Sequence, residues 1–144
     1  MANKLEEFCI SFPTAKALQK KDIFVESYFS WVKAWICGGI SDWHIETTVD
    51  VIRYSKVYQI EYLPAPIADE LLPLFPDYVD KNGETYHFDV GKETNAGITN
   101  VICQYISLDY ESLFHAKKPT LREAFAKVLI ELKEAGYGID GNKG

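Results

Sequence analysis

The segment that most constrains the fold lies near the end of the chain, at residues 119–137. Five apolar residues recur there at helical spacing and form one stripe, namely Leu121, Phe125, Val128, Leu129 and Leu132. Thr120 and Glu123 have the spacing of a capping box, and Gly136 stands where a left-handed C-cap belongs. The sequence therefore predicts an α+β fold whose C-terminal helix packs on one face of a mostly antiparallel sheet of about five to six strands.

The rest of the pattern predicts how the remaining elements follow one another. A first helix is expected over residues 11–21 and a second over residues 67–72, which gives two or three helices in all. Strands are expected over residues 28–37, 43–53, 56–63, 78–81, 84–90 and 98–108. Asn82-Gly83 suits a type I′ hairpin turn because both residues tolerate positive φ. With 144 residues and no repeat, the chain is expected to form one domain over residues 1–137 with a tail at 138–144.

Charge and cysteine content narrow the classes of partner. The net charge is −6, and the arginines Arg53 and Arg122 stand far apart, so nucleic acid is not an expected partner. Cys9, Cys37 and Cys103 are odd in number, form no CxxC pair and follow a polar start, which favours reduced thiols in the cytoplasm. No apolar run approaches the roughly 18 residues that cross a bilayer, so no membrane contact is expected.

Two strand faces carry side chains of the metal-ligand type. If the segment of residues 42–51 is a strand, Asp42, His44 and Glu46 share a face with Asp50. On the hairpin, His87 and Asp89 would share the face opposite Tyr86, Phe88 and Val90. If these faces met, Asp42, His44, Glu46, His87 and Asp89 would supply a metal site. The alternative is that both are the solvated faces of antiparallel strands.

The predicted strand over residues 28–37 is apolar on both faces. One face carries Phe29, Trp31, Trp35 and Cys37, and the other carries Tyr28, Val32, Ala34 and Ile36. Such a strand is covered on both sides, either by the chain's own helices as a central core strand or by a partner. In the second case Phe29, Trp31 and Trp35 form a binding surface, because aromatic residues are enriched at interfaces.

No motif of a known catalytic or cofactor site is present. The chain lacks GxGxxG, GxxxxGK[ST], GxSxG and HExxH, and its adjacent carboxylates diverge on any regular element. These absences favour a protein that is not an enzyme and uses no cofactor.

Three stretches together resemble a known group of proteins. They are Phe8 to Leu18, Ser27 to Val32, and Tyr62 to Pro76, and the residues Asn82 to Tyr86 and the closing helix fit the same layout. The chain is similar over residues 8–137 to small proteins of phages, prophages and integrated elements of gut bacteria, although residues 38–53 are longer than the pattern of that group. The resemblance implies an accessory protein of a mobile element and brings no activity with it.

We therefore expect a non-catalytic protein that binds a protein partner or self-associates. The alternatives are a small-ligand binder of the sponge type, and a metal-dependent hydrolase that uses the five strand-borne Asp, His and Glu residues.

Overall fold

The computed structural model describes residues 4–36 and 38–139 of the chain. It divides into two compact units, unit 1 (Met1–Glu70) and unit 2 (Leu71–Gly144). Each unit contains an antiparallel sheet of four strands, so the α+β class is confirmed. The prediction of one domain over residues 1–137 stays a prediction, and residues 140–144 of the expected tail lie outside the described residues.

Unit 1 begins with a short 3₁₀ turn, η1 (Lys4–Glu7), and the helix α1 (Phe12–Lys20), which confirms the first predicted helix. The hydroxyl of Ser11 caps α1 by accepting a hydrogen bond from the backbone N–H of Thr14. Asp22, at a φ of 57°, ends the helix in the left-handed conformation. The N–H of Asp22 donates to the carbonyl of Gln19 and that of Ile23 to the carbonyl of Leu18, which is the Schellman pattern.

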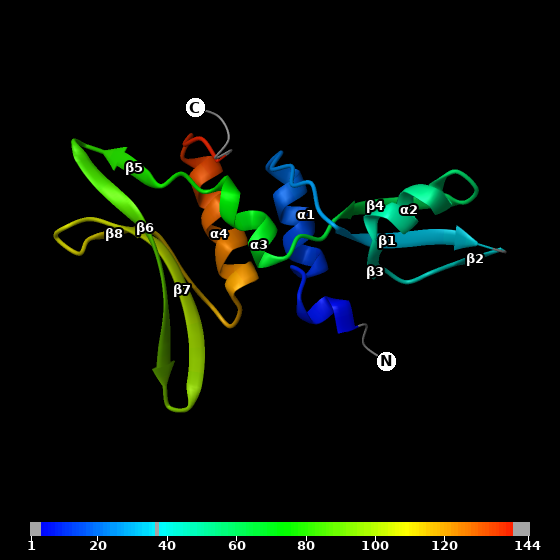
Figure 1. The fold of residues 1–144 in the computed structure, drawn as a ribbon, viewed down its shortest axis with the longest axis horizontal. Coiled ribbons are helices and arrows are strands. Elements are labelled where there is room, and N and C mark those ends of the chain that lie inside the picture. The colour runs from blue at the N-terminus through cyan, green and yellow to red at the C-terminus, as the bar shows by residue number, and fades with distance from the viewer. Residues whose placement is uncertain (1–3, 37, 140–144) are drawn as a thin grey trace. The chain divides into compact units, whose positions relative to one another are not determined.

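The strand β1 (Phe29–Ile36) lies at the centre of the sheet of unit 1 (Figure 1). The strand β4 (Gln59–Pro64) pairs with one edge of β1, whereas β3 (His44–Thr47) and the two-residue β2 (Gly39–Ile40) pair with successive parts of its other edge. Trp31 and Val32 point to opposite faces and are both buried. The sheet is therefore covered on both faces at this point, as expected for a central core strand.

The helix α2 (Thr48–Ser55) replaces the second half of a predicted strand. The prediction of a strand over residues 43–53 was right for β3 and wrong from Thr48 onward. The hydroxyl of Thr47 accepts a hydrogen bond from the backbone N–H of Asp50, and Asp50 lies near Arg53 at 3.8 Å. This N-cap and the complete burial of Val51 on the inner side of the helix outweigh the β-preference of the Val- and Thr-rich sequence.

Unit 2 is a four-stranded meander with the order β5-β6-β7-β8. The helix α3 (Ala68–Leu71) and the 3₁₀ turn η2 (Leu72–Leu74) connect the two sheets along the chain and confirm the predicted short helix. The strands are β5 (Tyr78–Lys81), β6 (Glu84–Asn95), β7 (Ile98–Ile106) and β8 (Ser112–Lys118). Each pairs with its neighbour in antiparallel register.

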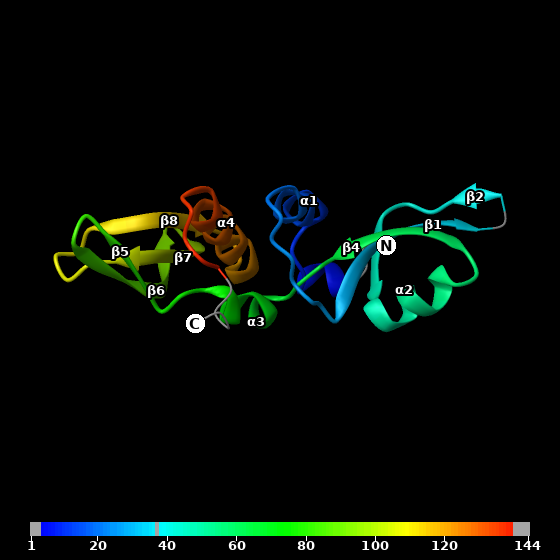
Figure 2. The ribbon, with the colours of Figure 1, turned by 90° about the horizontal axis from the view of Figure 1, so that it is seen from above.

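The helix α4 (Leu121–Glu134) packs against β7 and β8, as Figure 2 shows from above. The hydroxyl of Thr120 accepts a hydrogen bond from the N–H of Glu123, so the predicted N-cap is confirmed. Gly136, at a φ of 87°, donates to the carbonyl of Lys133, and Tyr137 donates to that of Leu132. This Schellman ending confirms the predicted C-cap. The stripe buried on the sheet includes Phe125, Val128, Leu129 and Leu132.

The strand β8 was not predicted, and a β-bulge explains why. The register of β7 against β8 shifts between Cys103 and Tyr105, and Phe114 has a φ of 55°. An extra residue at a bulge breaks the two-residue alternation from which a strand is recognised in a sequence. Leu113 and Phe114 are consequently both half-buried although they are consecutive.

Two tight turns in unit 2 have nearly the same geometry but different residues. Asn82-Gly83 joins β5 to β6 with φ values of 53° and 79°, which confirms the predicted hairpin. Ala96-Gly97 joins β6 to β7 with φ values of 54° and 79°. Alanine disfavours positive φ because its Cβ approaches the following carbonyl, whereas asparagine tolerates it.

Ala96→Asn is therefore expected to stabilise the β6–β7 hairpin by about 0.5–1 kcal/mol. Hydrogen exchange of the backbone amides next to the turn should slow by roughly 2- to 5-fold, since RT is about 0.6 kcal/mol. Asn82→Ala is the matched control and should accelerate exchange beside the other turn. Unchanged or faster exchange in Ala96→Asn would contradict the turn geometry.

Candidate functional site

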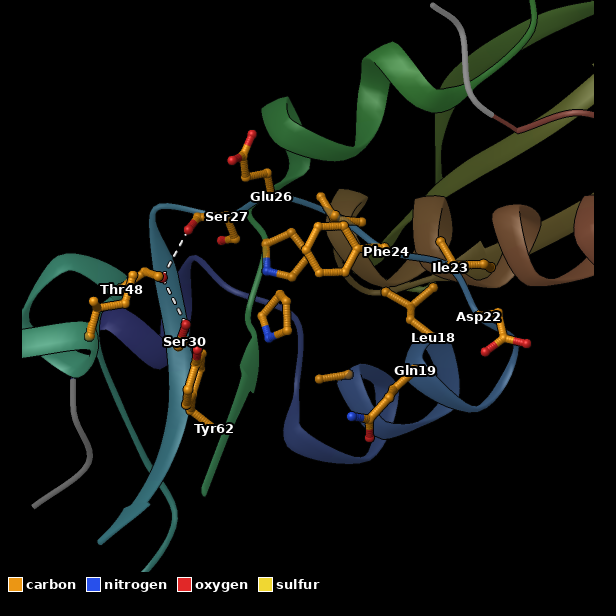
Figure 3. Close-up of a pocket in the computed structure, with 15 residues that line it drawn as sticks. Leu18, Gln19, Asp22, Ile23, Phe24, Glu26, Ser27, Ser30, Thr48 and Tyr62 are labelled. Carbon is orange, nitrogen blue, oxygen red and sulfur yellow. Dashed lines mark hydrogen bonds between the residues drawn. The ribbon is translucent and has the colours of Figure 1, made fainter. Parts of the chain in front are cut away.

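A groove of about 600 Å³ in unit 1 is the candidate site. It lies between α1, the segment of residues 22–27 that follows it, the start of α2, and β4 with the Pro64–Pro66 region that follows it. Figure 3 shows Ser30, Thr48 and Tyr62 on one side, and Leu18 and Gln19 of α1 on the other. This volume falls within the range of ligand sites, about 300–1,000 Å³.

The segment of residues 22–27 is held at both ends by hydrogen bonds. At its start, the Schellman ending at Asp22 turns the chain out of α1. At its end, the Glu70 carboxylate accepts hydrogen bonds from the hydroxyl of Ser27 at 2.9 Å and from the backbone N–H of Tyr28 at 2.8 Å. A third hydrogen bond to this carboxylate, from the N–H of Ile67 at 3.0 Å, holds Glu70 in place. The wall of the groove that carries Phe24 is therefore anchored at each side.

Three large apolar side chains of the groove are open to solvent. Phe24 is 78% exposed, Ile52 of α2 is 47% exposed and Tyr62 of β4 is 46% exposed. They come from three separate elements and line the same concave surface. Single exposed apolar residues are ordinary on a protein surface, but several around one hollow mark an interaction site.

A chain of hydroxyl groups lies at the sheet side of the groove. The Thr48 hydroxyl donates to the carbonyl of Ser27 at 2.8 Å, and the oxygens of Ser30 and Thr48 are 2.7 Å apart. Because the Thr48 proton is already committed, Ser30 must donate to Thr48. The buried Ser30 oxygen is then left as an acceptor, and the described residues that line the groove include no His, Cys or Lys that could activate it as a nucleophile.

Among the described residues that line the groove, two have charged side chains, and both are acidic. They are Asp22 and Glu26, which are exposed at the two ends of the 22–27 segment. In Figure 3 both carboxylates are turned away from the centre of the groove. The groove thus has an apolar interior and a negatively charged rim.

The predicted binding residues Phe29, Trp31 and Trp35 differ in how far they are exposed. Trp31 is only 6% exposed, and its Nε1–H donates to the carbonyl of Ile10 at 3.0 Å. It therefore belongs to the core and is not available to a partner in the folded unit. Phe29 and Trp35 are half-buried, and the Lys33 ammonium lies 5.8 Å from the centre of a Trp35 ring. None of the three lines the groove, and Cys37 lies outside the described residues.

The predicted metal ligands of unit 1 are already engaged with one another. His44 contacts the Asp42 carbonyl through Nδ1 at 2.8 Å and the Glu46 carboxylate through Nε2 at 2.6 Å. A carbonyl oxygen and an ionised carboxylate are both acceptors, so these two contacts favour the form of the ring that carries a proton on each nitrogen. A histidine in this state has no lone pair for a metal. Asp50, expected on the same face, lies instead in α2.

The other two predicted ligands lie in unit 2, on the face of β6 opposite Tyr86, Phe88 and Val90, as expected. His87 is exposed beside the ring of Tyr78, and Asp89 accepts a hydrogen bond from the amide of Gln104 at 3.1 Å. Within residues 4–36 and 38–139, no three His, Cys, Asp or Glu side chains gather into a group that could hold a metal ion.

The His44 environment predicts a pH dependence of stability. Burial lowers the pKa of His44, but the hydrogen bonds to Asp42 and Glu46 and the charge of Glu46 outweigh this and raise it above 6.5. The folded state therefore binds this proton more tightly than the unfolded state. The resulting stabilisation is fully present below about pH 6.5 and is lost as the pH rises through the raised pKa.

We expect Glu46→Gln to lower the pKa of His44 and to reduce the loss of stability that accompanies a rise in pH. The change in stability should stay below about 1 kcal/mol because the pair is partly exposed. An NMR titration of the His44 ring and urea unfolding at pH 5.5 and 8.5 would measure both quantities. An unchanged His44 pKa in the variant would contradict the contact.

Burial makes the thiol of Cys103 a poor nucleophile. Cys9 and Cys103 are buried, and burial together with the charge of Asp89 raises the pKa of Cys103 to about 12. A thiol with such a pKa stays protonated and is a poor nucleophile.

The groove was not predicted, although the sequence contains one signal for it. Ile23, Phe24 and Val25 form an apolar triplet in a segment to which no helix or strand was assigned. An apolar run between elements indicates a segment that packs as a wall. Ile52 was missed because residues 48–53 were expected in a strand.

The longest helix in the described part of the chain, α4, has 14 residues, and no helix there is both long and apolar enough to cross a membrane. Comparisons with protein-family models, with curated proteins and with solved structures found no match for this chain.

Proposed function

We propose that the chain is a non-catalytic binding protein and that the groove of unit 1 receives part of a protein partner. The observation that carries this proposal is the exposure of Phe24, Ile52 and Tyr62 around one hollow. Aromatic side chains that line a pocket commonly provide most of the energy of a protein–protein contact. The anchored 22–27 segment adds support, because a preformed wall loses little entropy when a partner binds.

We also propose that the protein acts in the cytoplasm as an accessory protein of a mobile genetic element. The support is the resemblance of residues 8–137 to proteins of phages and prophages, together with the three scattered cysteines. The genes on either side of its own gene test this context, since phage or integrase genes should flank it.

Substitutions at the rim of the groove test the binding proposal. Phe24→Ala and Tyr62→Ala should each weaken capture of the partner by about 30-fold or more, which corresponds to roughly 2 kcal/mol. Tyr110→Ala is the matched control, because Tyr110 is an exposed aromatic residue in the β7–β8 turn of unit 2. The affinity of Tyr110→Ala should equal that of the unchanged protein.

The experiment compares proteins from the native host that are retained by each variant and measures the affinity for the retained partner. Equal loss in all three variants would reject the groove as the contact surface. Sedimentation at several concentrations distinguishes a second copy of the chain from a foreign partner, because a dimer would dissociate in Phe24→Ala.

A small ligand is the second candidate, favoured by the volume of the groove.

A further inference from the structure

We infer that the groove selects a partner segment in which an apolar side chain is followed by lysine or arginine. This inference rests on the proposed function, since it concerns the chemistry of the partner at the same site. It follows from the separation between an apolar interior and an acidic rim.

The interior of the groove determines the first part of the ligand. Its walls are formed by aliphatic and aromatic side chains, among them Leu18, Ile23, Phe24, Ile52 and Tyr62. The hydroxyl of Ser30, a buried polar group that lines the groove, already donates its proton to Thr48. An apolar or aromatic side chain fits this environment because it leaves no polar group unsatisfied.

The rim determines the second part. Asp22 and Glu26 contribute two negative charges, and none of the described residues that line the groove is cationic. Neither carboxylate forms an ion pair with a side chain among residues 4–36 and 38–139. A cation of the partner would therefore be attracted to the end of the groove at which either carboxylate lies, whereas an anion would be repelled there.

The position of the two carboxylates favours a peptide over a free amine. Both are exposed and turned outward (Figure 3), so they are placed to attract a charge beside the groove and not one inside it. A peptide carries its apolar side chain and the charge of the next residue on separate backbone positions, which suits a groove whose interior is apolar and whose charges lie only at the rim.

Three capped dipeptides test the inference, each with tryptophan first and with lysine, glutamine or glutamate second. Their dissociation constants are measured by NMR at low ionic strength, from shifts of the backbone amides of residues 22–28 and β4. We expect the lysine peptide to bind about 2- to 5-fold more tightly than the glutamate peptide, with glutamine between them.

Substitutions then assign the preference to the rim. The double variant Asp22→Asn, Glu26→Gln should bring the ratio of the affinities for the lysine and glutamate peptides close to one. Asparagine is chosen at residue 22 because it tolerates the left-handed backbone there. The control Asp77→Asn, Asp109→Asn removes the same net charge from exposed positions in unit 2 and should keep the ratio. Equal ratios in all proteins would overturn the inference.

The remaining outcomes separate this inference from the proposed function. If all three peptides bind the unchanged protein equally, the groove stands as a binding site and the charge selection fails. If none of them shifts the groove amides, the proposed function fails with it. Tighter binding of tryptamine than of the lysine peptide would overturn the assignment to a protein segment.

Discussion

Replacing Trp31 by alanine is expected to destabilise unit 1 by about 3–5 kcal/mol. The indole is 6% exposed and meets the ring of Phe12 edge-on at 5.8 Å. Its cross-strand neighbours Ile45 and Leu63 are also buried, so truncation leaves a cavity and strips the Ile10 carbonyl of its donor. Such a loss is a large fraction of the 5–15 kcal/mol that stabilises a typical domain.

Hydrogen exchange of the amides in β1, β3 and β4 measures this effect for unit 1 directly. Trp35→Ala is the matched control, because it removes a half-buried indole from the same strand and should cost only about 1 kcal/mol. Trp31→Phe retains an aromatic ring, although a smaller one, and removes the N–H donor, so it should cost about 1–3 kcal/mol through the unsatisfied Ile10 carbonyl. If Trp31→Ala is no more harmful than Trp35→Ala, Trp31 is not a core residue.

The sequence was sufficient wherever a local signal determined the structure. The caps of α1 and α4 and the Asn82-Gly83 turn were predicted correctly because each depends on residues within one turn of the chain. The antiparallel pairing of β5 with β6 followed from that turn. The left-handed C-cap of α4 at Gly136 was also predicted from a local signal, the glycine itself.

Errors arose where a long-range contact decided between two local possibilities. The alternation through residues 43–53 suits a strand, yet the cap at Thr47 and the burial of Val51 make the second half a helix. The Ala96-Gly97 turn escaped notice because alanine is a poor residue for positive φ, although the paired strands hold it there.

The candidate site could not be predicted from local sequence signals, because tertiary structure alone assembles it. Its walls come from α1, a connecting segment, α2 and β4, and no spacing in the sequence brings these together. Conversely, Trp31 is of a residue type that is common at interfaces, yet it lies in the core. The residue types along a strand do not reveal which of its faces is covered by the rest of the chain. Phe24, by contrast, is 78% exposed in a segment without regular structure.

Replacing Leu129 by alanine is expected to destabilise unit 2 by about 2–5 kcal/mol. Leu129 is fully buried on the inner side of α4, which packs on β7 and β8. On the same side of the helix, the centre of the Phe125 ring lies 5.1 Å from that of Phe75 and 6.0 Å from that of Phe88. Such closely packed rings cannot readily move to fill the cavity that a shortened side chain leaves. Leu129→Met nearly conserves the volume and should cost less than about 1.5 kcal/mol.

Leu108→Ala provides the control of the same residue type, because Leu108 is 89% exposed in the β7–β8 turn. It should change the stability by no more than about 0.5 kcal/mol. The measurement is hydrogen exchange of the amides in β7, β8 and α4, since a chain with two compact units need not unfold in one step. Equal effects of Leu129→Ala and Leu108→Ala would refute the packing of α4 on its sheet, which both the sequence pattern and the structure indicate.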